Sequence, residues 1–141
     1  MTKLPRIALG TFLLSAACAF AQGGRSIAVD IVYTGSGTVN ASHKIYVALW
    51  DTADTTNSGP VEVKSIDSKV GSVTFTNVQK LPAYVNAAYD PSGKWTAQSP
   101  PPSGSSFGAY STHPPALTPI DPPPGKTTKV KITFDDKVKT P

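Results

Sequence analysis

The chain has 141 residues, of which 39% are hydrophobic, 16% are charged and 14 are proline, and its formal net charge is +4. This length is typical of one domain, and the composition excludes a chain that is disordered by charge or that spans a membrane through its body. The charged fraction lies below the ~25% usual for soluble domains, and serine, threonine, glycine and proline replace it, as in secreted β proteins.

Residues 1–21 have the pattern of a signal peptide. A short positively charged region precedes an uncharged stretch of apolar and small residues. Ala19 and Ala21 flank one bulky residue in the small-x-small arrangement of a signal peptidase site, so we expect the mature chain to begin at Gln22. The apolar stretch is too short to cross ~30 Å of hydrocarbon as a permanent helix. The protein is therefore expected to be periplasmic or extracellular, without a membrane span.

A lipid anchor is the alternative to plain export. The segment from Leu14 to Cys18 resembles a bacterial lipobox, in which an acylated cysteine follows a short apolar run. That pattern has a large aliphatic residue three positions before the cysteine, where this chain has Ser15, so we expect no lipid at Cys18. Export without the only cysteine excludes disulfides, so the core alone must stabilise the fold. The mature charge excess is small and gives no argument for a nucleic-acid partner.

Residues 22–141 read as one domain made of strands. Alternating apolar side chains predict strands at residues 27–33, 44–50, 61–64, 73–75, 84–89 and 129–134. Both faces of 44–50 are apolar, which indicates a central strand in a two-layer protein and places Trp50 on it. No long stretch has the 3.6-residue period of a helix. We therefore predict a single small antiparallel β-sandwich of six to seven strands.

Residues 91–126 hold 10 of the 14 prolines. Proline lacks the N–H that a sheet ladder needs and favours extended polyproline II structure, so we predict a long irregular loop before the last strand. The rings of Trp95, Phe107, Tyr110 and His113 argue against a plain linker. Two interpretations remain open: the rings pack the loop down as a lid over the sandwich, or they form a ligand-facing surface.

Recognisable catalytic and metal-binding patterns are missing from the sequence. His43 and His113 have no partner at metal-ligand spacing, and no nucleophile elbow or phosphate loop is found. Asp135 and Asp136 follow the last strand in a tail that reads as exposed, where solvated carboxylates would be weak acid–base catalysts. We therefore expect no cofactor, no metal and no catalytic residue.

Two strand segments resemble a pattern of small exported bacterial β-sandwiches, the prealbumin-like or carboxypeptidase-regulatory-like domains. They run from Val73 to Val78 and from Tyr84 to Asp90, and the family's later Phe-Gly pair and closing Gly-Lys-Thr strand are also present. The resemblance implies a β-sandwich and covers most of residues 27–134. Enzymes of this fold do not match: hydroxyisourate hydrolases end in Tyr-Arg-Gly-Ser, whereas this chain ends in Lys-Val-Lys-Thr-Pro.

The leading functional hypothesis is an exported, non-catalytic module that acts in binding or as a structural accessory. Its ligand platform would be Trp95, Phe107, Tyr110 and His113, because flat rings stack on the faces of sugars or on prolines, which indicates a glycan or an extended peptide as partner. The alternative is a small secreted hydrolase with a site built from loop residues. Its candidate residues are Asp90, Ser111 and His113.

Overall fold

The computed structural model describes residues 23–141. This part of the chain contains seven strands and no helix: β1 (Ser26–Tyr33), β2 (Ile45–Trp50), β3 (Glu62–Ile66), β4 (Val70–Phe75), β5 (Tyr84–Tyr89), β6 (Ser106–Ala109) and β7 (Thr127–Phe134). All six predicted strands are present, with ends that differ by at most a few residues. The predicted signal peptide, with Cys18 and the cleavage position at Ala19, Ala21 and Gln22, lies outside the described residues.

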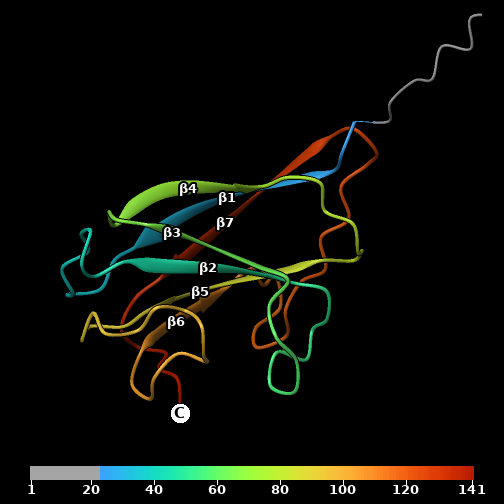
Figure 1. Cartoon of the computed structure of the whole chain (residues 1–141). Helices are drawn as coiled ribbons and strands as arrows, with labels where there is room; N and C mark the ends of the chain where they lie inside the picture. The colour runs from blue at the N-terminus through green and yellow to red at the C-terminus, as the bar shows by residue number, and fades with distance from the viewer. Residues whose placement is uncertain (1–22) are drawn as a thin grey trace, which may run out of the picture.

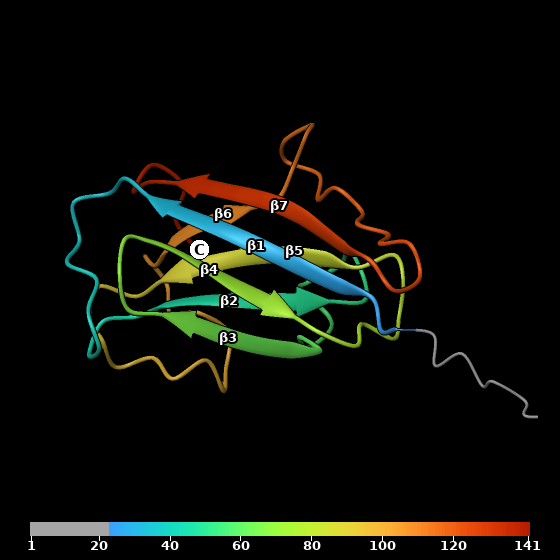
Figure 2. The same ribbon diagram turned by 90° about the horizontal axis from the view of Figure 1, so that it is seen from above.

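The strands form two sheets, so the predicted all-β class is confirmed and the architecture is compatible with a β-sandwich. One sheet has the order β4-β1-β7 and the other the order β3-β2-β5-β6. Figure 1 shows β4, β1 and β7 in a layer above β2, β5 and β6, and Figure 2 shows the same two layers from above. A fully antiparallel fold is wrong in one place, because β1 and β7 pair in parallel. These first and last strands are not joined by a hairpin, so no turn imposes opposite directions on them.

The core lies between the two sheets and takes one face of each central strand. On β1 the side chains of Ile27, Val29 and Ile31 are fully buried, in the period of two that the sequence shows. Ile45 and Val47 of β2 face them from the other sheet within the same apolar cluster. Each such side chain contributes roughly 1.5–3 kcal/mol when it leaves water. This shared cluster fixes which face of the four-stranded sheet points outward.

The outward face of the four-stranded sheet is also apolar. β2 pairs with β3 on one side and β5 on the other, so it is the central strand that its two apolar faces predicted. Its second set of side chains, which includes Tyr46 and Trp50, points away from the core. Trp50 is nonetheless only 9% exposed, since loops rather than a third sheet cover this face. These loops create the candidate site described below.

The predicted irregular loop 91–126 contains strand β6, and the expectation of an unbroken loop is wrong there. Ser106–Ala109 pairs with β5 at the end of the four-stranded sheet, in a stretch without proline. Gly108 allows β6 to lie close to the other sheet: a Cβ atom there would lie 2.5 Å from Cβ of Phe134. On the other side of β6, the amide of Phe107 donates to the carbonyl of Val138. The C-terminal segment therefore covers the free edge of this strand.

Candidate functional site

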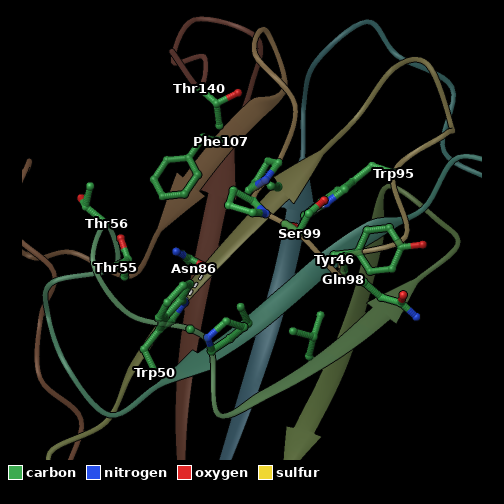
Figure 3. Close-up of a pocket in the computed structure, with 18 of the residues that line it drawn as sticks. Tyr46, Trp50, Thr55, Thr56, Asn86, Trp95, Gln98, Ser99, Phe107 and Thr140 are labelled. Atoms are coloured by element: carbon green, nitrogen blue, oxygen red, sulfur yellow. Dashed lines mark hydrogen bonds between the residues drawn. The ribbon is translucent and has the colours of Figure 1, made fainter.

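A groove of about 750 Å³ lies on the outward face of the four-stranded sheet. Figure 3 shows its floor, made by side chains of β2, β5 and β6, and the loop residues around it. Three segments form the walls: residues 55–60 after β2, residues 95–101 after β5, and residues 139–141 at the end of the chain. Small-molecule and peptide sites commonly have volumes of this size, with mostly apolar walls and few polar groups.

The shape of the floor follows from side-chain size on neighbouring strands. Tyr46, Ala48 and Trp50 share the outward face of β2, because alternate residues of a strand point the same way. Ala48 lies opposite Asn86 of β5, and Tyr46 lies opposite Ala88. Ala48 thus lies between Tyr46 and Trp50 along β2, and Ala88 lies between Tyr46 of β2 and Phe107 of β6 across the sheet. The floor is hollow at the alanines and bounded by Tyr46, Trp50 and, beyond Ala88 on β6, by the ring that Phe107 contributes.

Asn86 provides the one buried amide of the floor. The residue is 7% exposed, and its Oδ1 accepts a hydrogen bond of 3.0 Å from the indole Nε1 of Trp50. An indole nitrogen can only donate, so this contact assigns the orientation of the Asn86 amide. Its Nδ2 donates to no group in the described residues and is not enclosed by protein atoms. Figure 3 shows this nitrogen on the side away from the Trp50 ring, so two N–H donors face the groove.

The loop that carries Trp95 begins with a turn organised by Asp90. The Asp90 carboxylate accepts hydrogen bonds from the backbone N and the Oγ of Ser92, at 2.9 and 2.6 Å, and from the backbone N of Trp95 at 3.0 Å. Burial alone would raise the pKa of Asp90, but these hydrogen bonds outweigh it and hold the pKa below its usual value. Asp90 is therefore a structural carboxylate that sets where the Trp95 wall starts.

Trp95 forms the wall of the groove next to Tyr46. The two ring centroids lie 4.9 Å apart with an interplanar angle of 69°, an edge-to-face arrangement that aromatic pairs favour. The Trp95 Nε1 donates to the carbonyl of Ser99 at 2.8 Å, which closes the loop on itself. The ring is half-buried. It thus packs the loop against the sheet and leaves part of its surface in the groove.

The four residues predicted as a ligand platform do not lie together. Trp95 and Phe107 both line the groove. Tyr110 instead packs against the core, and its backbone N donates to the carbonyl of Val85. His113 is exposed in a turn outside the groove, where its Nδ1 lies 3.1 Å from the hydroxyl of Thr112. The platform in the structure is therefore half of the predicted set, together with side chains of β2 and β5.

The residues proposed for the alternative hydrolase are not brought together either. Asp90 follows the last residue of β5, whereas Ser111 and His113 follow the residue that pairs with the start of this strand. Five residues of strand separate the two ends by roughly 16 Å. The Ser111 hydroxyl donates to the carbonyl of Ala116, so it is part of the turn. Asp90 is therefore out of reach of both Ser111 and His113.

Trp50, Tyr46 and Asn86 are the floor residues that sequence reasoning did not assign to a site. Their signal was present in the second apolar face of residues 44–50, which was interpreted as the mark of a central strand. That interpretation is correct for strand order, but it does not tell which layer covers the second face. Loops cover it here, and incompletely, so the same apolar residues become the floor of a groove.

Asp136 is the centre of a second polar cluster. The expectation that it is a solvated carboxylate in an exposed tail is therefore wrong. The Tyr33 hydroxyl and the Ser106 hydroxyl donate to its Oδ1 at 2.5 and 2.7 Å, and the backbone N and the Oγ of Ser36 donate to its Oδ2 at 2.8 and 3.0 Å. The hydrogen bond from Tyr33, followed by those from Ser106 and Ser36, holds the pKa of Asp136 far below its usual value. Burial and the same carboxylate raise the pKa of Tyr33 to about 12. Asp136 thereby ties the loop after β1 to β6.

Asp136→Asn is expected to lower the free energy of unfolding by about 2 kcal/mol at pH 7. Hydrogen bonds to a charged group are worth roughly 1.5–3 kcal/mol, and the lower part of this range applies because the side chain is 33% exposed. A carboxylate whose pKa is depressed by folding stabilises the protein above its unfolded pKa of ~3.9, and this stabilisation is lost as the pH falls below that value. Denaturant melts at pH 7 and pH 2.5 measure both effects.

The variant and the wild-type protein should differ less in stability at pH 2.5 than at pH 7, because the wild-type protein has by then lost part of the stabilisation from Asp136. The effects of the other carboxylates are common to both proteins and cancel in the comparison. Lys137→Asn is a matched control, since the Lys137 side chain is exposed and its ammonium lies 3.5 Å from the carboxylate of Asp135, not of Asp136. A difference between Asp136→Asn and wild type that stays the same at both pH values would contradict the assigned role.

Within residues 23–141, no three histidine, cysteine, aspartate or glutamate side chains are grouped closely enough to hold a metal ion. The same residues include no helix with the length and hydropathy needed to span a bilayer.

Neither the protein-family models, nor the curated proteins, nor the solved structures include a match to the chain. The described residues thus define an all-β, two-sheet protein with an aromatic groove on the outward face of one sheet.

Proposed function

We propose that the protein is an exported, non-catalytic binding module of the periplasm or cell surface, and that its ligand occupies the groove. The observation that carries this proposal is the arrangement of four aromatic rings around the Asn86 N–H groups that face the groove; the rings belong to Tyr46, Trp50, Trp95 and Phe107. Rings around a small number of fixed polar groups are the usual composition of a binding site. Flat rings also lose little side-chain entropy when a ligand covers them.

The polar groups near the groove support binding rather than catalysis. Lys139 is the one charged side chain among the described residues that line it, and its ammonium lies 3.6 Å from the carboxylate of Asp136. Its Nζ also donates to the hydroxyl of Ser106 at 2.9 Å, but Ser106 is fully buried. A substrate could not reach this hydroxyl. The hydrolase alternative would need Asp90 and His113 to act together from opposite ends of β5.

We also propose that the chain is related to the prealbumin-like and carboxypeptidase-regulatory-like domains. The motif segment from Val73 lies in β4 and the turn after it, the segment from Tyr84 is β5, and the closing Gly-Lys-Thr segment enters β7. The Phe107-Gly108 pair of the resemblance lies in β6, where the glycine permits close packing and the phenylalanine faces the groove. The motif positions are therefore structural, and they support a common framework rather than a common ligand.

Tryptophan fluorescence tests the binding function directly, because the chain's two tryptophans, Trp50 and Trp95, both line the groove. The purified protein is titrated with soluble oligosaccharides and with extended peptides, and each mixture is analysed for cleavage products. We expect a saturable change in emission for one ligand class and no product. Emission that no ligand changes would contradict binding in the groove, and release of products would establish the hydrolase instead.

Export predicts the mass of the mature protein. We expect the protein purified from its own host to begin at Gln22, with or without cyclisation of this glutamine to pyroglutamate, and to carry no lipid. Intact-mass spectrometry of the protein from both the soluble and the membrane fractions measures this, and an Ala21→Lys variant that blocks the cleavage position is the control. A species that starts at an acylated Cys18 would contradict the prediction and attach the module to a membrane.

A further inference from the structure

We propose that the ligand class is a proline-rich peptide in the extended polyproline II conformation; this inference rests on the proposed binding function of the groove. A glycan and a peptide would both be attracted by exposed rings. The two differ in the hydrogen-bonding groups that they bring into the site, in their shape and in their charge. Each of these properties can be compared with the described residues of the groove.

The Asn86 amide of the floor suits a ligand group that only accepts. The Oδ1 of Asn86 is already occupied by the Trp50 indole, so the amide offers two donors and no acceptor. A prolyl residue has a carbonyl oxygen and no N–H, and its carbonyl is free because polyproline II has no internal hydrogen bonds. Such a carbonyl can accept from Asn86 Nδ2 without burying an unsatisfied donor.

A sugar fits this floor less well. Each sugar hydroxyl is both donor and acceptor, and a buried donor without a partner costs roughly 1–3 kcal/mol. The described residues that line the groove include no Asp or Glu side chain, and the side-chain acceptors of its walls are serine and threonine hydroxyls and the amide oxygen of Gln98. Lys139, the one cation among the described lining residues, is turned toward Asp136 and Ser106. The charges therefore complement a neutral ligand that presents carbonyl oxygens.

The dimensions of the floor suit a short extended segment. The groove reaches from Val63 of β3, across β2 and β5, to Phe107 of β6. Three inter-strand spacings of ~4.8 Å make this width roughly 14 Å. Polyproline II rises ~3.1 Å per residue, so about four to five residues would cross the floor. The hollows at Ala48 and Ala88 lie between the rings, where pyrrolidine rings of such a segment could fit.

Prolines of this chain lie around the groove. Pro60, Pro100 with Pro101, and Pro141 line the groove, and they come from three separate segments of the chain. Prolines of this chain therefore border the aromatic face, and three of the four, Pro60, Pro100 and Pro141, are exposed. Docking of proline-rich segments on aromatic-lined grooves is also a recurrent mode of peptide recognition. A fourth proline-bearing segment, supplied by a partner, would occupy the space that these three segments border.

The test measures the binding of three probes to the purified protein by the change in tryptophan emission. The probes are an acetylated nonapeptide with three Pro-Pro-Ala repeats, a glycine-serine peptide of the same length, and a set of neutral linear hexasaccharides. We expect saturable binding of the proline peptide only. The Asn86→Asp variant keeps the acceptor for Trp50 and removes both donors, so the affinity for the proline peptide should fall at least tenfold. His113→Ala, outside the groove, should leave the affinity unchanged.

The possible outcomes separate this inference from the proposed function. Binding of a hexasaccharide without binding of the proline peptide would overturn the peptide inference and leave the binding function in place. Binding of neither probe class would overturn both. Equal binding of the proline and glycine-serine peptides, or an unchanged affinity in folded Asn86→Asp, would also overturn the inference. If Asn86→Asp does not give a native melt, Phe107→Leu decides instead: a tenfold loss of affinity is expected, and no loss overturns the inference.

Discussion

Trp50→Ala is expected to lower the free energy of unfolding by roughly 3–5 kcal/mol, the range for removal of a buried large aromatic side chain. The ring is 9% exposed although it lies on the outward face of β2, because the loops of the groove surround it. The substitution also leaves the Oδ1 of Asn86 without the donor that holds it at 3.0 Å. Chemical denaturation of wild type and variant at pH 7 measures the difference.

Trp50→Phe separates the two contributions. This variant keeps an aromatic ring and removes only the indole donor, so we expect a loss of about 1–2 kcal/mol, typical of a hydrogen bond with one partner removed. A loss below about 1 kcal/mol for Trp50→Ala is what surface positions show. That result would mean that the ring is not part of the folded floor, and the geometry of Asn86 would then have no support.

The double variant Trp95→Ala/Phe107→Ala is expected to weaken ligand binding at least a hundredfold. Aromatic hot spots in binding sites often carry ~2 kcal/mol or more each, and these two rings form opposite sides of the groove. Stability should fall by less than it does in Trp50→Ala, because both rings are only half-buried. Isothermal titration calorimetry measures the affinity, because it does not depend on the emission of the tryptophans.

His113→Ala and Tyr110→Ala are the matched controls for this double variant. Both positions were predicted platform residues, but His113 is exposed outside the groove and Tyr110 packs on the core. Loss of Tyr110 should therefore lower stability without a direct effect on affinity, and loss of His113 should change neither. An unchanged affinity in the Trp95 and Phe107 double variant would remove the groove as the binding site, whichever ligand is used.

The strands were predictable because their side-chain period is local. The segment 84–89 agrees with β5 at both ends, since Val85 and Ala87 enter the core at a spacing of two. Strand β6 was not predictable in this way. It has four residues within a proline-rich stretch, and it is stabilised by pairing with β5 and by the close contact that Gly108 permits with β7. Both interactions join segments that are distant in the sequence.

The site was predictable only in part, for a related reason. Aromatic residues in a proline-rich segment identified Trp95 and Phe107, but the floor residues Trp50 and Asn86 belong to a face whose cover depends on the path of three loops. Asp136 shows the same limit more clearly. Two of its donors, Tyr33 and Ser36, precede it by 103 and 100 residues. Nothing in the local pattern of residues 135–141 predicts such partners.

Amide NMR of the ¹⁵N-labelled protein tests the central claim most directly. The protein is titrated with the proline-rich nonapeptide, or with whichever probe changes the tryptophan emission, and shifts are followed for backbone and side-chain N–H groups. We predict the largest shifts at the Nδ2 protons of Asn86 and the indole protons of Trp50 and Trp95, with smaller shifts along β2, β5 and β6. Shifts confined to the turn around His113 or to the outward face of the β4-β1-β7 sheet, with the Asn86 amide unmoved, would contradict the account.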